Sequence, residues 1–330
     1  MIHSPFNSPA SKVAAVVVSY NGAHLVSSCL ESLLQSSIAI NLVVVDNASI
    51  DGTCKVIAKF ANVQLIENKE NVGFGRGCNA GISRALKNGA EYILLLNQDA
   101  EVQRDTVELL LTHMQQNPKV GIACPLQFTA NGGAVDSIFL RYYLAPFASE
   151  LISDSIRNEL KPSYVAKHAP AAAWLISAKF LHEVGGFDPL FFMYSEDDDM
   201  CRRATFHGYD LTIVPSARFN HMRAFYIKKS PESLVSQIRR KTSRIRSTLV
   251  ASAKSLTDHP FKSLYHAITK QLCDSLGGLL GHMDWIPFVA SLIASIGTVL
   301  ELPRILRHRQ ISMKKGPHWL ECATAPKTKA

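Results

Sequence analysis

The sequence predicts an α/β protein built on a mostly parallel sheet with helices on both faces. Four apolar, strand-like segments occur between residues 13 and 99, and segments with helical spacing of apolar residues separate them. Such alternation is typical of a doubly wound sheet, because a parallel strand needs a crossover helix before it. With 330 residues, of which 47% are hydrophobic, the chain can form one large α/β domain and an appended region.

The first three predicted elements are a strand, a helix and a second strand. Residues 13–20 (VAAVVVSY) form an apolar, β-branched run that breaks at Asn21-Gly22, which indicates a buried strand followed by a loop. Apolar residues recur at helical spacing over residues 25–34, so a helix follows. Residues 41–46 (NLVVVD) predict the second strand, which ends on Asp46.

The fourth predicted strand brings a second carboxylate to the same edge of the sheet. Residues 63–67 predict a short third strand, and a glycine-entered helix follows over residues 73–87. The next apolar run, YILLLNQDAEV (92–102), stops at Asp99. Ligands bind at the carboxyl edge of open α/β sheets, so Asp46 and Asp99 are expected to face one crevice. A carboxylate there can hold a hard divalent cation and, through it, a phosphate.

The chain becomes less regular after the fifth predicted strand, at residues 120–128. Residues 129–170 show no clear periodicity and contain turn residues, which predicts a long variable loop region. Residues 171–187 (AAAWLISAKFLHEVGGF) then predict a short strand and a helix that stops at Gly185-Gly186.

Cysteine usage and the amino terminus predict a cytosolic protein. The seven cysteines are scattered, odd in number and never form a C-x-x-C pair, which favours a reducing compartment and excludes a zinc knuckle. The first residues, MIHSPFNSPASK, lack the basic and apolar segments of a secretory signal.

Charge divides the chain into two unequal parts. Residues 1–222 carry a net charge of −4, whereas residues 223–330 carry +12. The basic character therefore belongs to the carboxyl-terminal region, which we treat as a separate unit over residues 226–330. No aromatic-interleaved basic surface accompanies this charge, so nucleic acid is not an expected partner.

Five segments stand in a fixed order between residues 13 and 225: SYNGAHLVSSCLESL, VVVDNASIDGT, ENVGFGRGCNAG, LLLNQDA and GGFDPLFFMYSEDDDMCRR. Together they resemble the inverting family 2 glycosyltransferases of the GT-A fold, and most closely their bacterial rhamnosyltransferase-like branch. The resemblance implies a catalytic domain over residues 1–225. Its nucleotide half would cover about residues 13–128 and its acceptor half about residues 129–225.

The resemblance implies a set of residues around the nucleotide. Tyr20 and Asn21 match the loop that closes over the base, and Asp46 matches the carboxylate that accepts a hydrogen bond from a pyrimidine ring. A loop-stabilising role is the alternative for Asp46. Gly75 and Asn79 match the segment beneath the nucleotide, where glycine permits close approach of the backbone.

The same comparison implies a divalent metal, Mg²⁺ or Mn²⁺. Asn97-Gln98-Asp99 matches the D-x-D motif, although asparagine replaces its first aspartate and brings no negative charge. His221, at the end of a predicted strand, matches a position that can ligate the metal. Asp99 and His221 are therefore the expected metal ligands, with Asn97 beside the donor.

Four successive acidic residues in YSEDDDMCRR, residues 194–203, provide the candidate general base. The resemblance assigns that role to Asp197, with Glu196 beside it. Like charges at this density raise the pKa of at least one carboxyl, which suits a base that acts on a sugar hydroxyl. If a helix begins at Ser195, helix capping and pairing with arginine are the structural alternative. On the acceptor side, Trp174 is expected to stack on a sugar, with a core position as its alternative.

The implied reaction is inverting transfer of a hexose from a nucleotide-diphosphate sugar to a saccharide or lipid-linked acceptor in cell-surface polysaccharide synthesis. Rhamnose from a thymidine-diphosphate donor is the first expectation, and a UDP-hexose is the alternative donor. A sugar-1-phosphate nucleotidyltransferase and a non-catalytic nucleotide-sugar binding protein are the alternative functions.

The carboxyl-terminal region is expected to form helices at a membrane. IRRKTSRIRSTLVASAK predicts a basic helix, and residues 285–300 form an uncharged stretch of 16 residues, short of the ~20 that span a bilayer. We expect peripheral contact with the anionic inner face of the plasma membrane. A homodimer contact and packing on the catalytic domain are the alternatives. Removal of residues 230–330 is expected to leave the donor site intact.

Overall fold

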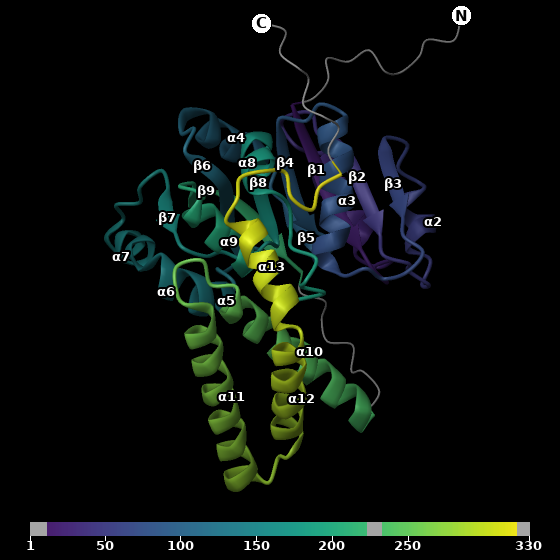
Figure 1. The fold of residues 1–330 in the computed structure, drawn as a ribbon. Helices are drawn as coiled ribbons and strands as arrows, with labels where there is room; N and C mark the ends of the chain where they lie inside the picture. The colour runs from purple at the N-terminus through teal and green to yellow at the C-terminus, as the bar shows by residue number, and fades with distance from the viewer. Residues whose placement is uncertain (1–11, 223–232, 322–330) are drawn as a thin grey trace, which may run out of the picture.

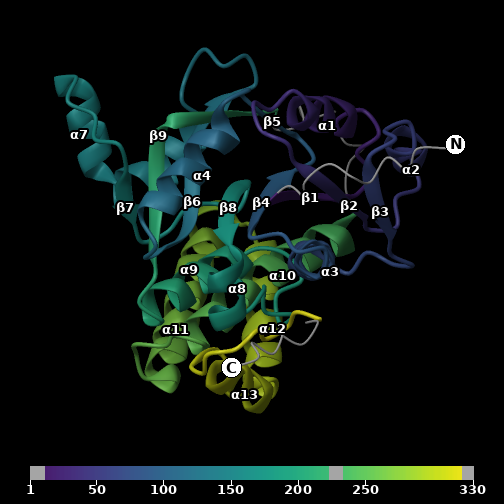
Figure 2. The same cartoon turned by 90° about the horizontal axis from the view of Figure 1, so that it is seen from above.

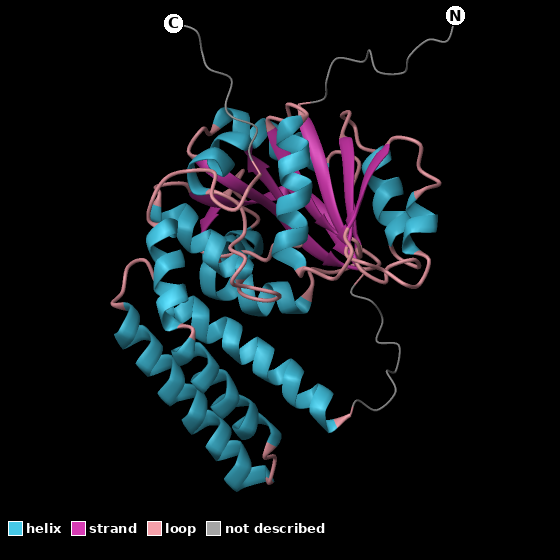
Figure 3. Cartoon of the chain, turned by 45° about the vertical axis from the view of Figure 1, so that its right-hand side comes forward, coloured by secondary structure: helices cyan, strands magenta, loops and turns pink. Residues whose placement is uncertain are grey.

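The computed structural model describes residues 12–222 and 233–321. Its main body is a mixed sheet of nine strands with helices on both faces, and a helical carboxyl-terminal region extends from this body (Figures 1 and 3). The predicted α/β class is confirmed. The residues before 12, between 222 and 233 and after 321, including Cys322 and most of the amino-terminal segment, lie outside the described part of the chain.

The amino-terminal half of the sheet is parallel, as the alternating pattern predicts. Its four strands are β1 (Val13–Ser19), β2 (Asn41–Asp46), β3 (Val63–Glu67) and β4 (Tyr92–Asn97). They lie in the order β3-β2-β1-β4 and alternate with α1 (Val26–Leu34), α2 (Thr53–Ile57) and α3 (Phe74–Lys87). The register pairs Ser19 with Asp46 and Val18 with Asn97, so the polar ends of these strands share one edge.

The other half of the sheet is mixed, with both antiparallel and parallel strand pairs. The added strands are β5 (Ala100–Val102), β6 (Val120–Thr129), β7 (Tyr164–Ala166), β8 (Ala173–Ser177) and β9 (Asp210–His221). The full order is β3-β2-β1-β4-β8-β6-β9-β5, with β7 on β9. Because β5 runs antiparallel to β9, Ala100 lies opposite His221, and this register brings His221 back to the edge where β4 ends.

Residues 129–170 are more ordered than the sequence predicts. They contain short helical turns at α5 (Ser137–Phe139), η1 (Leu140–Leu144) and α6 (Ala145–Phe147), then α7 (Ser149–Arg157). The Asp136 side chain caps the first turn by accepting from the backbone N–H groups of Ile138 and Phe139. The first three turns have three to five residues each, which is too short for a clear helical period, so the pattern indicates a loop.

Helices cover the sheet with two separate apolar cores (Figure 2). One core lies under α3, α8 (Ala178–Val184) and α9 (Glu196–Phe206) and includes Trp174 and Phe180. The other lies under α1 and α4 (Thr106–Gln116) and includes Leu30 and Leu110. Helix α9 thus enters the fold from the face that also holds α3.

The carboxyl-terminal region consists of four helices: α10 (Leu234–Ala253), α11 (Pro260–His282), α12 (Ile286–Leu300) and α13 (Leu302–Ser312). A third apolar core joins this region to the catalytic domain, where Leu190 and Phe191 pack with Leu249, Leu264 and Ile305. Beyond this core, α11 and α12 project as a helical hairpin (Figure 1).

A buried network of ion pairs also joins the carboxyl-terminal region to the sheet domain. The Lys254 ammonium, 2% exposed, contacts carboxylates of Asp188 and Asp199, with 2.6 Å to Asp199 Oδ1. The other oxygen of Asp188 lies 2.8 Å from His308 Nδ1, and Arg203 Nε donates to Asp199 Oδ2 at 2.9 Å. Burial alone would raise the pKa of Asp188, but Lys254 and His308 outweigh it and lower the pKa below its ordinary value.

This network argues against the expectation that removal of residues 230–330 leaves the donor site intact. Such a truncation would delete Lys254 and His308 and leave Asp188 and Asp199 buried without those partners. An uncompensated buried charge is strongly destabilising. The basic region is therefore in part an integral component of the fold.

Replacement of Lys254 by Met should lower the free energy of unfolding by about 3–5 kcal/mol, because it leaves two buried carboxylates short of their ammonium partner. Urea unfolding measures the loss. Lys270→Met is the matched control, since it removes the same group from an exposed pair with Asp274 and should leave stability nearly unchanged. Equal stability of the two variants would show that the network does not stabilise the fold.

Candidate functional site

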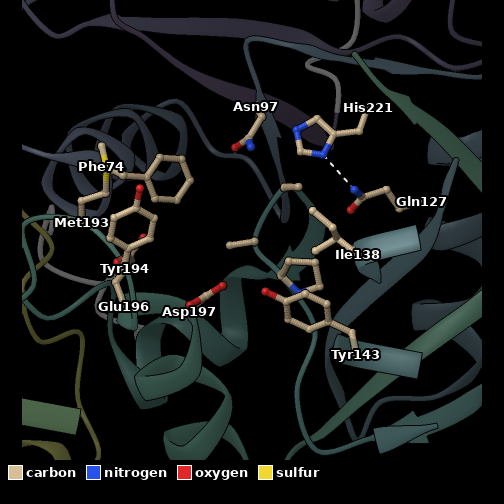
Figure 4. A pocket seen from close by; sticks show the side chains of 13 residues that line it. Phe74, Asn97, Gln127, Ile138, Tyr143, Met193, Tyr194, Glu196, Asp197 and His221 are labelled. Carbon is tan, nitrogen blue, oxygen red and sulfur yellow. Dashed lines mark hydrogen bonds between the residues drawn. The ribbon is translucent and has the colours of Figure 1, made fainter. Parts of the chain in front are cut away.

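A cavity of about 330 Å³ lies between the carboxyl ends of the sheet strands and the first turn of α9 (Figure 4). One wall carries Asn97, Gln127 and His221, whereas the opposite wall carries Glu196 and Asp197. The remaining lining is mostly apolar and aromatic, from Phe74, Ile138, Tyr143, Pro170, Ala171, Ala172, Met193 and Tyr194. Polar groups thus converge from two sides on a space that an organic ligand can fill.

The loops after β1 and β2 are joined beside this cavity by side-chain hydrogen bonds. Asp46 is buried, and both its oxygens accept from Ser49, at 2.8 Å from the backbone N–H and 2.5 Å from Oγ. Asn21 exchanges hydrogen bonds with the same loop, from its N–H to Ser49 Oγ and from Ile50 N–H to its Oδ1. Asp46 therefore stabilises its own loop, which is the alternative role considered for it.

Gln98 fixes the position of Tyr20, a role that the sequence did not reveal. Its Oε1 accepts from Ser19 Oγ at 2.6 Å and from Tyr20 N–H at 3.1 Å, and its Nε2 donates to the Tyr20 carbonyl. A Cβ on Gly22 would lie 2.0 Å from Gln98 Oε1, so a larger residue there would displace the Gln98 amide from these hydrogen bonds. The middle residue of the N-x-D motif thus supports the loop, while the Tyr20 ring stays exposed.

Gly75 and Asn79, which were expected beneath the nucleotide, both contact Phe187 in the loop before α9. A Cβ on Gly75 would lie 2.9 Å from Phe187 Cβ. Asn79 donates to the Phe187 carbonyl at 2.7 Å and accepts from its N–H at 2.8 Å, so both polar groups of the amide are used. The close approach that glycine permits here is between α3 and the loop before α9.

Trp174 is also a core residue, and the expectation that it stacks on an acceptor sugar is wrong. Its side chain is fully buried and stacks on Phe187 at a centroid distance of 6.4 Å. The small, apolar neighbours of Trp174 in β8 were the signal for burial on both faces of the strand. Tyr143 does line the cavity, and its ring lies 5.2 Å from the His168 ring in a tilted arrangement.

The proposed metal ligands lie together. His221 Nε2 is 3.2 Å from Asp99 Oδ1, and among the described residues these two belong to no cluster of three or more His, Cys, Asp or Glu side chains. A pair of one imidazole and one carboxylate leaves the remaining positions of a cation for water and phosphate oxygens, which is how Mg²⁺ is usually held at phosphate sites.

The contacts of Gln127 indicate whether Asp99 and His221 are suited to hold a cation. Its side chain is 1% exposed, its Nε2 lies 2.8 Å from His221 Nδ1, and its Oε1 has no partner among the described residues. Rotating the amide by 180° places Oε1 on Nδ1–H, which satisfies the orphaned oxygen. His221 Nε2 then presents a lone pair towards Asp99, so two acceptors face each other and a cation fits between them.

Helix α9 delivers the two candidate catalytic carboxylates from a strained turn. Tyr194 and Ser195 both adopt left-handed conformations, with φ of 72° and 66°. Ser195 occupies the N-cap position but makes no side-chain capping hydrogen bond, contrary to the structural alternative. The turn therefore positions Glu196 and Asp197 at the cavity, and such strain is common at functional sites.

The four acidic residues divide between two environments. Asp198 pairs with Arg202 at 2.7 Å, and Asp199 pairs with Arg203 and Lys254 away from the cavity. Glu196 and Asp197 lack such an arginine partner in the described structure.

The pKa values of the two cavity carboxyls reflect this division. Burial raises the pKa of Glu196 to about 8, with a further contribution from the charge of Asp197, and its Oε2 has no hydrogen-bond partner among the described residues. Burial also raises the pKa of Asp197, although the nearby His168 opposes the shift. Burial and mutual repulsion thus favour one proton on the pair, which leaves the other carboxylate available to accept a proton.

Comparison with known proteins gives a consistent picture. The model described as "Glycosyl transferase family 2" matches residues 14–185, more than half of the chain. The N-acetylglucosaminyl-diphospho-decaprenol L-rhamnosyltransferase of Mycobacterium tuberculosis is 25% identical over 240 residues, covering 66% of this chain and 78% of that protein. The dTDP-rhamnosyl transferase RfbF of Shigella flexneri is 24% identical over 213 residues, covering 64% and 69%.

Solved structures confirm the expected GT-A fold. The mannosyltransferase PcManGT from Pyrobaculum calidifontis, in complex with GDP-Man and Mn²⁺, superposes with a TM-score of 0.55 at 19% sequence identity. The superposition covers 94% of this chain and 87% of that one, so it includes the carboxyl-terminal helices as well as the sheet.

The raised pKa of Glu196 predicts a specific pH dependence of stability. Between about pH 4.5, the ordinary pKa, and pH 8, folded Glu196 holds a proton that the unfolded chain has lost. Its contribution should therefore fall as pH rises, by at most about 1.4 kcal/mol per pH unit. Glu196→Gln removes this titration, so urea unfolding from pH 5 to 8 should show the wild type losing stability relative to the variant. Parallel stability curves would contradict the assignment.

Proposed function

The chain belongs to glycosyl transferase family 2, in its rhamnosyltransferase branch, and we propose that it transfers L-rhamnose from a thymidine-diphosphate donor with inversion at the anomeric carbon. The acceptor is a hydroxyl of a lipid-linked saccharide used in cell-surface polysaccharide synthesis. Two named relatives support this choice, since one is a dTDP-rhamnosyl transferase and the other acts on a diphospho-decaprenol acceptor.

The observation that supports this proposal most strongly is that two polar walls face each other across the cavity. Asp197 lies on one side, and Asn97 and His221 lie on the other (Figure 4). A donor whose diphosphate rests at the sheet edge has its sugar between these walls. An acceptor hydroxyl beside Asp197 then lies opposite the leaving group, which is the geometry of a single in-line displacement.

The reaction follows from these positions. Asp197 accepts the proton of the acceptor hydroxyl, whose oxygen forms a bond to the anomeric carbon while the bond from that carbon to the diphosphate oxygen breaks. One attack from the opposite face inverts configuration, and no covalent sugar intermediate is formed. When it holds the proton of the pair, Glu196 can donate a hydrogen bond to a sugar oxygen from the same wall.

The base of the donor is assigned to the loops beside the cavity. Tyr20 is exposed above the ends of β1 and β2 and can cover a pyrimidine, while Asp46 can accept from the ring N–H. Thermal shift of the purified chain with thymidine, uridine and guanosine diphosphate sugars tests this choice. Stabilisation by a guanosine donor alone would contradict a pyrimidine site.

Asp99 and His221 would hold a divalent metal, Mg²⁺ or Mn²⁺, with Gln127 orienting the imidazole. When bound, the cation neutralises charge on the departing diphosphate. Asn97 contributes a neutral amide where many relatives would have a carboxylate, so Asp99 supplies the negative charge of the N-x-D motif.

We assign the reaction to the inner face of the plasma membrane, where a nucleotide sugar and a lipid-linked acceptor can meet. The acceptor named for the Mycobacterium tuberculosis relative and the basic carboxyl-terminal region support this location.

Replacement of Asp197 by Asn should reduce transfer at least about 1,000-fold while donor binding persists, because the amide keeps the shape but cannot accept a proton. A radiolabelled sugar-transfer assay measures turnover, and calorimetry measures donor affinity. Asp198→Asn is the matched control, since this neighbour pairs with Arg202 outside the cavity lining. Near-normal turnover of Asp197→Asn would move the base to Glu196.

Replacement of Asp99 by Ala should abolish the dependence of donor binding on Mn²⁺, because it removes the carboxylate of the proposed pair. Gln127→Met keeps both ligands but releases the imidazole, so Mn²⁺ affinity should fall about 10- to 100-fold. Electron paramagnetic resonance measures the concentration of free Mn²⁺ and therefore reports metal binding in the absence of catalysis. Unchanged affinity in both variants would place the metal elsewhere.

A further inference from the structure

Helix α12 has its side chains distributed in the reverse of the usual pattern. The residues it buries are small or carry hydroxyls: Ala290, Ser291, Ala294, Ser295 and Thr298. The residues it exposes are large and apolar: Leu292, Ile293, Ile296, Val299 and Leu300. A helix of a water-soluble domain buries its large apolar residues. Small residues between helices and large apolar residues outside are typical of helices that contact lipid.

Two of the three hydroxyls on the inner face of α12, those of Ser291 and Thr298, are satisfied within the hairpin, whereas Ser295 Oγ has no partner among the described residues. Ser291 Oγ donates to the Pro287 carbonyl at 2.7 Å and accepts from Gln271 Nε2 of α11 at 3.2 Å. Thr298 Oγ1 donates to the Ala294 carbonyl at 2.7 Å. These bonds need no water, so Ser291 and Thr298 keep their partners when the hairpin enters an apolar medium.

The free end of the hairpin is apolar as well. Leu280, Met283 and Trp285 are 77%, 84% and 44% exposed around the connection of α11 to α12. Between Asp274 and Glu301 the sequence has one formally charged residue, Asp284. Figure 1 shows this end as the part of the hairpin that lies farthest from the sheet.

Basic residues surround the other end of the hairpin. Arg304 and Arg307 are exposed on α13, and Lys262 is exposed in the first turn of α11. Arg239 is exposed on α10, which packs along α12. An apolar tip with a basic base is complementary to a bilayer whose headgroups are anionic.

The hairpin base is connected to the lip of the catalytic cavity through α10. Ser247 Oγ donates to the Met193 carbonyl at 3.0 Å, and the Arg244 guanidinium lies 4.6 Å from the centroid of the Tyr194 ring. Both Met193 and Tyr194 line the cavity. A surface that receives the hairpin therefore lies near the cavity opening.

We propose that the α11–α12 hairpin inserts its tip and the large-residue face of α12 into the headgroup and outer acyl region of an anionic bilayer. This proposal rests on the proposed function in one respect: the inserted hairpin would present the cavity to a lipid-linked acceptor. Insertion is shallow: α12 has 15 residues, or about 22 Å, against the ~30 Å of a bilayer core.

A membrane span is not required. No single helix in residues 12–222 and 233–321 is long and apolar enough to cross a bilayer, whereas α12 and α13 together pass by length and composition with a bend of 66°. In the structure α13 turns back to the catalytic domain, where Ile305 is buried and His308 bonds to Asp188. Of these two helices, α12 would therefore contact lipid, whereas α13 packs on the protein.

Flotation of the full chain with phosphatidylglycerol–phosphatidylcholine vesicles tests the proposal. The wild type should float, and the double variant Leu280→Asp/Ile296→Asp should lose at least about tenfold in partition coefficient, because both carboxylates would enter apolar lipid. Ile156→Asp is the matched control: Ile156 is 82% exposed on α7, and its replacement should leave flotation unchanged. Equal loss in both variants, or no flotation of the wild type, would overturn the proposal.

Tryptophan quenching gives a measurement that does not depend on the folding of the double variant. Trp285 fluorescence should be quenched by brominated acyl chains and remain so in 0.5 M salt, and Trp285→Phe should remove the quenched component. Complete release by salt would show attachment by charge alone and overturn insertion. A wild-type dimer that fails to float, and that Ile296→Asp dissociates, would assign the face to a second copy and also overturn it.

Nucleotide-sugar binding, measured on the same samples by thermal shift, separates this proposal from the proposed function. Absent flotation with intact donor binding would overturn insertion alone. Flotation without donor binding would support insertion and contradict the proposed reaction.

Discussion

The pairing of Lys254 with two buried carboxylates is the interaction on which the arrangement of the site depends. Four acidic residues begin α9, and their mutual repulsion would oppose burial of this turn. Lys254, from the end of α10, compensates Asp199 and the neighbouring Asp188, and Arg203 adds a second cation. Because these charges are compensated on one side of α9, the helix can present Glu196 and Asp197 without a cation on the other.

The sequence predicts what is local and repeated. The four amino-terminal strands, their order of alternation and their polar carboxyl ends follow from apolar runs that stop abruptly, so Asp46 and Asn97 could be placed at one edge in advance. The acidic turn of α9 was equally visible, because four successive carboxylates beside an apolar run need a physical explanation. His221 could be placed only through the family resemblance, since its position depends on antiparallel pairing of β5 with β9.

What could not be predicted depends on contacts between distant residues. Asn79 and Trp174 both meet Phe187, and nothing near either residue in the sequence indicates that partner. Gln127 and Gln98 were missed for a different reason, since a glutamine in a strand or loop is usually solvated. Gln127 did leave a signal: it stands in the otherwise apolar run of β6, where a buried amide requires a partner.

The carboxyl-terminal region, which charge and composition present as one unit, divides into two parts with opposite burial. Helices α10 and α13 supply Lys254, His308 and Ile305 to the catalytic domain, so selection for a stable fold acts on them. Helices α11 and α12 bury few large side chains, and the stability of the domain does not explain why α12 exposes Ile296 and Leu300. Such an exposed apolar face is the one that the proposed insertion into a bilayer would use, and the chain that joins α12 to α10 connects it to Tyr194 at the cavity. Under that proposal, one helical segment both supports the catalytic turn and meets the surface that holds the acceptor.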